Sequence, residues 1–157
     1  MGGSRIAIRI SSYAPDNMAI KLIECDKQKS YKLAEYMNDI IIIQGDGRNV
    51  DLLKEEGIRD MDAFIALTDS SETNILACLT AKELGVKKTI AEVENIQFIS
   101  TAERLNIGNI INKKLLAASR IFQLLLDEDS SNAKCLALSD AEVVELVAKE
   151  NSKITKA

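Results

Sequence analysis

Short apolar runs alternate along the chain with longer segments in which apolar residues recur every three or four positions. The apolar runs have the length of strands and are rich in isoleucine and valine, as in parallel sheets covered on both faces. They are Met18–Ile23, Ile40–Ile43, Ala63–Leu67, Thr89–Val93 and Asn109–Ile111. The segments between them predict helices over Lys27–Met37, Val50–Glu56, Glu72–Leu84, Gln97–Leu105 and Leu115–Leu126. Strand–helix units that recur every ~20–25 residues predict an α/β fold with a doubly wound parallel sheet.

The alternation of strand-like and helical segments ends after Leu126. A polar stretch, Asp127–Asn132, predicts a linker, and two short strand-like runs follow at Cys135–Leu138 and Glu142–Val147. Two small strands do not form a core by themselves. We therefore expect one domain over residues 1–126, and over residues 127–157 a linker with the truncated start of a small C-terminal domain.

The amino-terminal residues allow two interpretations. In the first, Arg5–Ile10 is a strand, but the link to the next apolar run is too short for a parallel crossover, so the pair would form an antiparallel hairpin. In the second, Gly2–Ala7 is a degenerate G-x-G-x-x-G/A loop that opens a helix over Arg5–Tyr13, with apolar residues at i, i+4 and i+7. Met-Gly-Gly-Ser is also a common artificial linker sequence. We prefer the helix.

The helix interpretation predicts a Rossmann-like fold in which the first strand, normally central in the sheet, is missing. The central position in the sheet must then be occupied by a strand of another chain or by a C-terminal strand, or the neighbouring strands pair directly with each other. In such folds an acidic residue follows the loop by about 20 residues and accepts hydrogen bonds from the ribose hydroxyls. Glu24 stands there, and its charge would repel a 2′-phosphate, which favours NAD over NADP.

Composition excludes several classes of function. The chain has 157 residues, 46% of them hydrophobic, and no histidine, which excludes Ser-His-Asp and Cys-His catalysis and His-ligated zinc. A net charge of -4 and a pI near 5.0 argue against nucleic acid as a partner. The three cysteines are far apart, and neither a signal peptide nor an apolar run of about 18 residues occurs, so we expect a cytoplasmic protein.

Several stretches together form a distinctive string. They are Lys21–Asp26 (KLIECD), Ile43–Gly47 (IQGDG), Leu52–Ile58 (LLKEEGI), Asp62–Asp69 (DAFIALTD), Glu72–Asn74 (ETN), Ala81–Lys88 (AKELGVKK) and Leu115–Ala118 (LLAA). This string resembles the RCK (KTN) nucleotide-binding domain of the TrkA-type potassium-uptake regulators. The resemblance covers Gly2–Leu126 and is closest to the second of the two halves that these regulators carry in tandem. The tail from Cys135 resembles the start of their RCK-C domain.

The resemblance implies a non-enzymatic cytoplasmic regulator that binds NAD(H) or ATP/ADP and controls a membrane potassium-transport subunit of the TrkH type. The regulator would lie at the inner membrane through that partner, as a homodimer or higher ring built through its last helices. The family's nucleotide contacts fall on Gly2, Gly3, Ser4, Arg5 and Ile6 at the pyrophosphate, on Glu24 at the ribose, on Asp46 and Gly47 beside the adenosine, and on Thr68, Asp69 and Glu92 near the far end.

Two positions depart from the family's pattern. Many relatives have Ser-Pro-Glu before the last helix, where this chain has Asn112-Lys113-Lys114. At Glu92 relatives often have an arginine, which would attract a phosphate that glutamate repels. The sequence allows two other functions: a receiver-like signalling domain with Asp46 as phosphoacceptor, and, less favoured, a fragment of an NAD-dependent oxidoreductase, which would lack a substrate domain and a proton-shuttling histidine.

Overall fold

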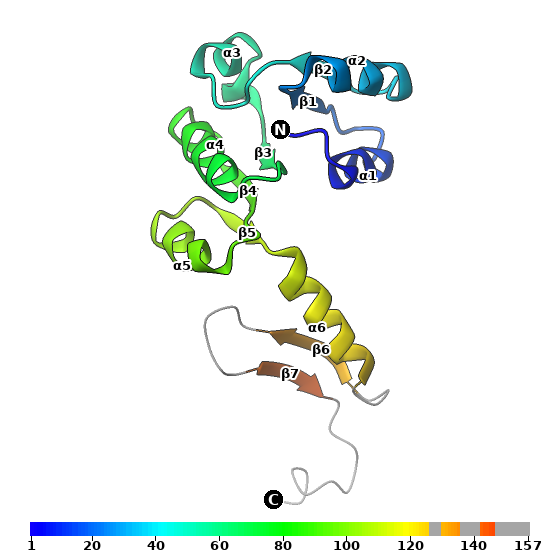
Figure 1. The fold of residues 1–157 in the computed structure, drawn as a ribbon, viewed down its shortest axis with the longest axis vertical. Helices are drawn as coiled ribbons and strands as arrows, with labels where there is room; N and C mark the ends of the chain where they lie inside the picture. Colours follow the sequence, from blue (N-terminus) through cyan, green and yellow to red (C-terminus); the bar gives the residue numbers. More distant parts are fainter. Residues whose placement is uncertain (126–129, 136–141, 147–157) are drawn as a thin grey trace, which may run out of the picture. The chain divides into compact units, whose positions relative to one another are not determined.

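The computed structural model describes residues 1–125, 130–135 and 142–146 (Figure 1). The chain divides into two compact units, residues 1–111 and 112–157. The expected division at residues 126 and 127 stays a prediction. In the part of the chain that the structure describes, no helix is both long and apolar enough to cross a membrane.

The first unit alternates helices with short strands, as the hydrophobic pattern predicts. Its strands are β1 (Lys21–Glu24), β2 (Ile41–Gln44), β3 (Ala63–Ala66), β4 (Lys88–Glu92) and β5 (Asn109–Ile111). Its helices are α1 (Arg5–Tyr13), α2 (Lys27–Tyr36), α3 (Val50–Glu55), α4 (Ser71–Glu83) and α5 (Ile96–Arg104), with a 3-10 turn, η1, at Ile58–Asp60. The amino-terminal segment is thus a helix and not a strand, and the run predicted from Met18 becomes a strand only at Lys21.

All the strand pairs of the first unit are parallel. β1 pairs with β2, and β3, β4 and β5 form a second group in that order. The carboxyl ends of parallel strands meet at one edge, so the residues that follow the strands gather along that edge. This places the turns after β1, β2, β3 and β4 where a Rossmann-like fold binds its ligand.

Met1 and Gly2 join the two groups of strands. The terminal ammonium of Met1 donates a hydrogen bond of 2.7 Å to the Ile65 carbonyl, and Leu67 N–H donates one of 2.9 Å to the Met1 carbonyl. On the other side, Gly2 N–H donates to the Ile23 carbonyl at 2.8 Å. The chain terminus lies between β1 and β3 in Figure 1. Met1 and Gly2 therefore stand where the carboxyl end of the first strand of a Rossmann-like fold would pair.

The core of the first unit lies between the strands and the helices that cover them. It consists of aliphatic side chains with one phenylalanine and one buried cysteine. Its members include Leu22, Ile23, Leu33, Ile43, Leu53, Phe64, Leu67, Ile75, Cys78, Val86, Val93, Ile99 and Ile107. By contrast, the α1 residues Ile10 and Tyr13, which the periodicity places on one face, are 40% and 72% exposed.

The second unit begins with α6 (Lys113–Leu125) and contains an antiparallel pair, β6 (Ser130–Cys135) with β7 (Glu142–Leu146). The strand β7 confirms the run predicted from Glu142. The prediction of a polar linker reaching Asn132 is wrong, because Ser130–Cys135 forms a strand despite its polar composition. Pairing with a partner strand outweighs weak intrinsic strand propensity. Of the predicted run Cys135–Leu138, only Cys135 lies within the described residues.

Candidate nucleotide site

The glycine turn that leads into α1 is tightly enclosed. Gly2 has a φ of 89°, and a Cβ there would lie 2.9 Å from the Leu67 carbonyl oxygen. A Cβ on Gly3 would lie 2.5 Å from a methyl carbon of Leu33 and 2.8 Å from Oε2 of Glu24. Gly2 therefore requires glycine, because of its positive φ and its contact with the Leu67 backbone, whereas a Cβ at Gly3 would force the Leu33 and Glu24 side chains to shift. The turn brings bare backbone to the carboxyl edge of the strands.

The amino end of α1 presents donors at the same edge. Ser4 is the N-cap, and its Oγ accepts a hydrogen bond of 3.3 Å from Ala7 N–H. Arg5 and Ile6 occupy the first turn, where a helix provides no acceptor for the N–H groups. Among the described residues, their two amides have no other acceptor. Two N–H groups, the positive end of the helix dipole and the exposed Arg5 guanidinium are therefore available to an anion.

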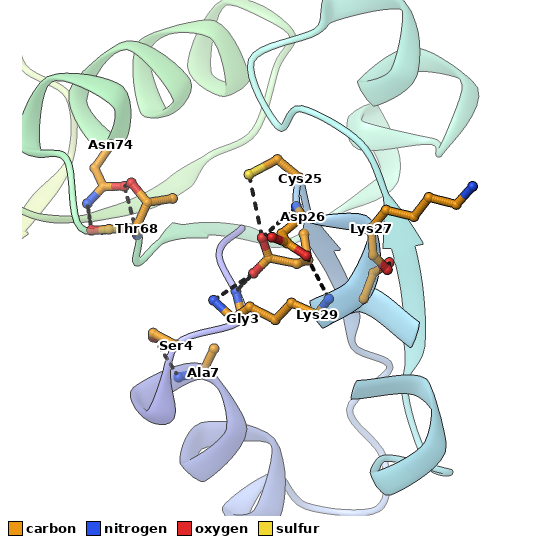
Figure 2. Close-up of polar contacts among 11 residues, drawn as sticks. Gly3, Ser4, Ala7, Cys25, Asp26, Lys27, Lys29, Thr68 and Asn74 are labelled. Atoms are coloured by element: carbon orange, nitrogen blue, oxygen red, sulfur yellow. Dashed lines mark hydrogen bonds and ion pairs between the residues drawn. The ribbon is translucent and has the colours of Figure 1, made fainter. Parts of the chain in front are cut away.

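Glu24, at the end of β1, is directly joined to this turn. Its side chain is buried, and its Oε2 accepts a hydrogen bond of 2.8 Å from Gly3 N–H across 21 residues of sequence. Oε1 accepts from Asp26 N–H at 3.0 Å and from the Cys25 thiol at 3.5 Å. The ammonium of Lys29 on α2 lies 3.0 Å from Oε2. Figure 2 shows the labelled residues Gly3, Cys25, Asp26 and Lys29 close together, with contacts between the drawn residues as dashed lines.

These contacts hold the Glu24 carboxylate ionised. Burial by itself raises its pKa, but the hydrogen bonds from Asp26 N–H, the Lys29 ammonium and Gly3 N–H outweigh burial and lower the pKa from 4.5 to about 2. Glu24 thus fastens the glycine turn to the end of β1 by a charged hydrogen bond. A carboxylate beside a glycine turn and a helix amino terminus is the arrangement expected for a ribose next to a pyrophosphate.

Asp46 and Gly47 follow β2 and lie apart from Glu24. The Asp46 carboxylate is bound by the Arg48 guanidinium, with Nη2 to Oδ2 at 2.7 Å and Nε to Oδ1 at 3.0 Å. Hydrogen bonds from the Arg48 side chain lower the pKa of Asp46. Gly47 is buried, and the Met1 side chain fills the space that a Cβ would need. The turn after β2 therefore packs on the first residue, while Asp46 presents an ion pair to solvent.

The turns after β3 and β4 are tied together by Asn74, a fully buried residue of α4. Its Oδ1 accepts hydrogen bonds from Thr68 N–H at 3.0 Å and from Thr68 Oγ at 2.6 Å (Figure 2). Its Nδ2 donates to the Thr68 carbonyl at 2.9 Å and to the Glu92 carbonyl at 2.8 Å. Glu92 is buried, and Asp69 is exposed beside Thr68. Asn74 thus fixes the position of Thr68 at the edge.

The predicted site residues all lie along the carboxyl edge, in three clusters. The first contains Gly2 to Ile6 and Glu24, the second Asp46 and Gly47, and the third Thr68, Asp69 and Glu92. Sequence reasoning missed Lys29, Arg48 and Asn74 as members of these clusters. The signal for Lys29 was its place three residues after Asp26, whose side chain caps α2 by accepting from Lys29 N–H. Nothing in the sequence indicated which carboxylate its ammonium meets.

Comparison with known proteins identifies the family. The family model of the TrkA-N domain matches residues 1–113. The Trk system potassium uptake protein trkA homolog 1 of Methanosarcina mazei is 32% identical over 139 residues, which are 88% of this chain and 34% of that protein. The chain thus spans about a third of the length of the relatives it matches.

Two solved structures share the fold. The TrkA-N domain of the inner membrane protein ybaL from Escherichia coli aligns with a TM-score of 0.68 at 11% identity, over 79% of this chain and 91% of that one. The GsuK channel bound to NAD aligns with a TM-score of 0.63 at 16% identity, over 74% of this chain and 21% of the channel chain. At these identities the likeness concerns the fold alone. Because the TrkA-N model covers well over half of its residues, this chain belongs to the TrkA-N domain family.

Proposed function

We propose that this chain is a regulatory, non-enzymatic domain of a potassium uptake system. It binds NAD(H) at the carboxyl edge of its strands and thereby controls a membrane transport subunit. The observation that carries the proposal is the glycine turn at the start of α1, held against a buried glutamate, in a member of the TrkA-N family. Relatives named as Trk system potassium uptake proteins support the physiological setting.

The residues fit a dinucleotide at two points. Gly2 and Gly3 carry no side chain and so let a pyrophosphate approach the backbone. The amides of Arg5 and Ile6, with the Arg5 guanidinium, would hold the phosphate charge. Glu24 would receive the ribose beside them. The proposal extends the site along the edge through Ser4, Asp46, Gly47, Thr68, Asp69 and Glu92.

NAD(H) is preferred to ATP or ADP for this site. A carboxylate at the end of β1 suits the ribose diol of either nucleotide. Among the structural neighbours, however, the GsuK channel is bound to NAD, and an exopolyphosphatase-related protein from Archaeoglobus fulgidus is described by its NAD(P)-binding domain.

We further propose that this chain forms a dimer through α6 and that the dimer controls the transport subunit. Leu116, Ile121 and Leu124 on this helix are 58%, 59% and 71% exposed, so α6 presents an apolar surface suited to a second copy. A nucleotide would favour one of two arrangements of the dimer. It can shift the equilibrium between them only by as much as its affinities for the two arrangements differ. The dimer, or a ring of dimers, would act on a TrkH-type subunit from the cytoplasmic side of the inner membrane.

No observation favours the two alternative functions. A receiver-like phosphoacceptor would need Asp46 near a free acidic pair, but Asp46 is bound by Arg48 and Glu24 is enclosed by its own donors. An oxidoreductase would use the same glycine turn, but the carboxylate beside that turn, Glu24, is already engaged by its own donors. We therefore retain the regulatory domain as the proposed function.

The proposal is tested by calorimetric titration of the chain with NADH, with ATP in parallel. We expect micromolar binding of NADH and weaker binding of ATP. Arg5→Glu should weaken NADH binding about tenfold, which is about 1.4 kcal/mol, because it reverses a charge at the pyrophosphate. A glutamate in the first turn is favourable for the helix, so this variant should remain folded.

Arg9→Glu is the matched control. Arg9 is also exposed on α1, one turn further along, where its guanidinium stacks on the Tyr13 ring at 4.9 Å. The same charge reversal there should leave NADH affinity within about twofold of the original, since it lies away from the glycine turn. Absence of binding of both nucleotides at millimolar concentration would refute the proposed function. Equal losses in the two variants would refute the placement of the pyrophosphate.

A further inference from the structure

The acceptor positions of the Glu24 carboxylate are all engaged. A carboxylate offers about four lone-pair positions, two on each oxygen. Oε2 accepts from Gly3 N–H and from the Lys29 ammonium, and Oε1 accepts from Asp26 N–H and from the Cys25 thiol. A ribose that donates two hydroxyl groups to Glu24 must therefore displace at least one of these donors.

Lys29 is the donor that can leave most readily. Two of the other donors are backbone amides, fixed by the glycine turn and by the turn into α2. The third donor, the Cys25 thiol, belongs to the residue next to Glu24 in the sequence and is a weak donor. The Lys29 side chain is 50% exposed, against 5% for Glu24, and its ammonium ends a flexible stem. Its own N–H is held by Asp26 Oδ1 at 2.8 Å, so the ammonium can swing into solvent without movement of the helix.

The position of this ammonium has opposite consequences for the two nicotinamide dinucleotides. A ligand with a free 2′-hydroxyl has to compete with Lys29 for Glu24. A ligand with a 2′-phosphate brings an anion to the same place, where the ammonium can leave the carboxylate and pair with the phosphate. Glu24 alone would select strongly for the hydroxyl, because it repels a phosphate. Lys29 works against that selection.

We infer that Lys29 sets the selectivity of this site between NADH and NADPH, by occupying the ribose acceptor of Glu24 and by offering a counter-charge to a 2′-phosphate. The inference rests on the proposed function, because it concerns the same site. It assigns to Lys29 direct contact with the ligand. In this chain, the preference for NADH is accordingly smaller than a buried glutamate at the end of β1 would otherwise give.

Lys29→Met tests the inference, because it keeps the apolar stem and removes the charge. The dissociation constants for NADH and NADPH are measured by calorimetry at one ionic strength. We expect NADH to bind about threefold tighter, since its competitor is gone, and NADPH to bind about tenfold weaker, since its counter-charge is gone. The ratio of the two constants should thus change by more than tenfold. Lys29→Arg keeps the charge and should retain a ratio close to the original.

Lys27→Met is the matched control. Lys27 lies on the same helix two residues away, its side chain extends away from the cluster in Figure 2, and its ammonium lies 6.0 Å from the centre of the Tyr31 ring. Its loss makes the net charge more negative by the same one unit, so both ligands should bind slightly more weakly and the ratio of their dissociation constants should stay constant. Urea midpoints of all variants are compared with the original chain to verify folding.

The outcomes separate the inference from the proposed function. If the original chain binds NADH or NADPH and the ratio does not change in Lys29→Met, the inference is wrong and the proposed function stands. If the ratio changes equally in Lys27→Met, general charge and not the contact with Glu24 determines selectivity, which also overturns the inference. If the original chain binds neither dinucleotide, both proposals fall together.

Discussion

Replacing Glu24 by glutamine should destabilise the fold by an amount that depends on pH. Glutamine has nearly the shape of a protonated glutamic acid, so the variant resembles the protein with Glu24 neutral. The pKa of this carboxyl is 4.5 in the reference state and about 2 in the folded chain. At about 1.36 kcal/mol per pKa unit, the ionised form contributes about 3 kcal/mol to folding at pH 7.

The sign of the pH dependence follows from the direction of the shift. Because the pKa is lowered on folding, the stabilisation is fully present above about pH 4.5 and is lost as the pH falls toward 2. About 1.4 kcal/mol of it remains at pH 3 by the same relation. The difference in stability between the original chain and Glu24→Gln should therefore narrow by about 2 kcal/mol between pH 7 and pH 3.

Urea unfolding followed by far-ultraviolet circular dichroism measures this difference at several pH values. Glu35→Gln is a suitable control, because Glu35 is exposed on α2 and its removal should cost less than about 0.5 kcal/mol at any pH. Two results would contradict this expectation: a loss of less than about 1 kcal/mol in the free energy of unfolding of Glu24→Gln at pH 7, or a loss that is independent of pH. Either result would mean that the hydrogen bonds from Gly3, Asp26 and Lys29 do not hold the carboxylate ionised.

Three further predictions concern other parts of the chain. Asn74→Ala should cost about 2–4 kcal/mol in urea unfolding, because it removes the four hydrogen bonds that the buried Asn74 side chain makes with Thr68 and the Glu92 carbonyl. Loss of the exposed cap in Asn95→Ala should cost about 1 kcal/mol, and equal costs would contradict this. Leu116→Asp should yield monomers in sedimentation velocity, and persistent dimers would place the interface elsewhere. Four β-branched apolar residues added before Met1 should pair with β1 and β3 and raise the melting temperature by at least about 4 °C, relative to an added Gly-Ser segment of the same length. Equal melting temperatures would show that no added strand pairs between β1 and β3.

Local chemistry explains why the sequence predicted the elements of the first unit. Ser70 caps α4 by accepting a hydrogen bond from Thr73 N–H. Gly57 and Gly85, which follow the C-caps of α3 and α4, adopt left-handed φ values of 74° and 104°. Caps and left-handed glycines depend on residues within a few positions of one another, so the sequence carries them directly. The parallel order of the elements follows from their alternation. The likeness to a nucleotide-binding family likewise rests on stretches of contiguous residues.

Only the tertiary structure decided how distant residues share the site. Gly3 and Glu24 are 21 positions apart, and Asn74 and Glu92 are 18 apart, so no local pattern indicated their hydrogen bonds. The polar strand β6 forms because β7 pairs with it, against its own propensity. Met1 and Gly2 together join β3 to β1 by backbone hydrogen bonds, which pair groups that would otherwise lack a partner. The sequence thus determined the elements and their order, whereas long-range hydrogen bonding determined which charges meet at the carboxyl edge.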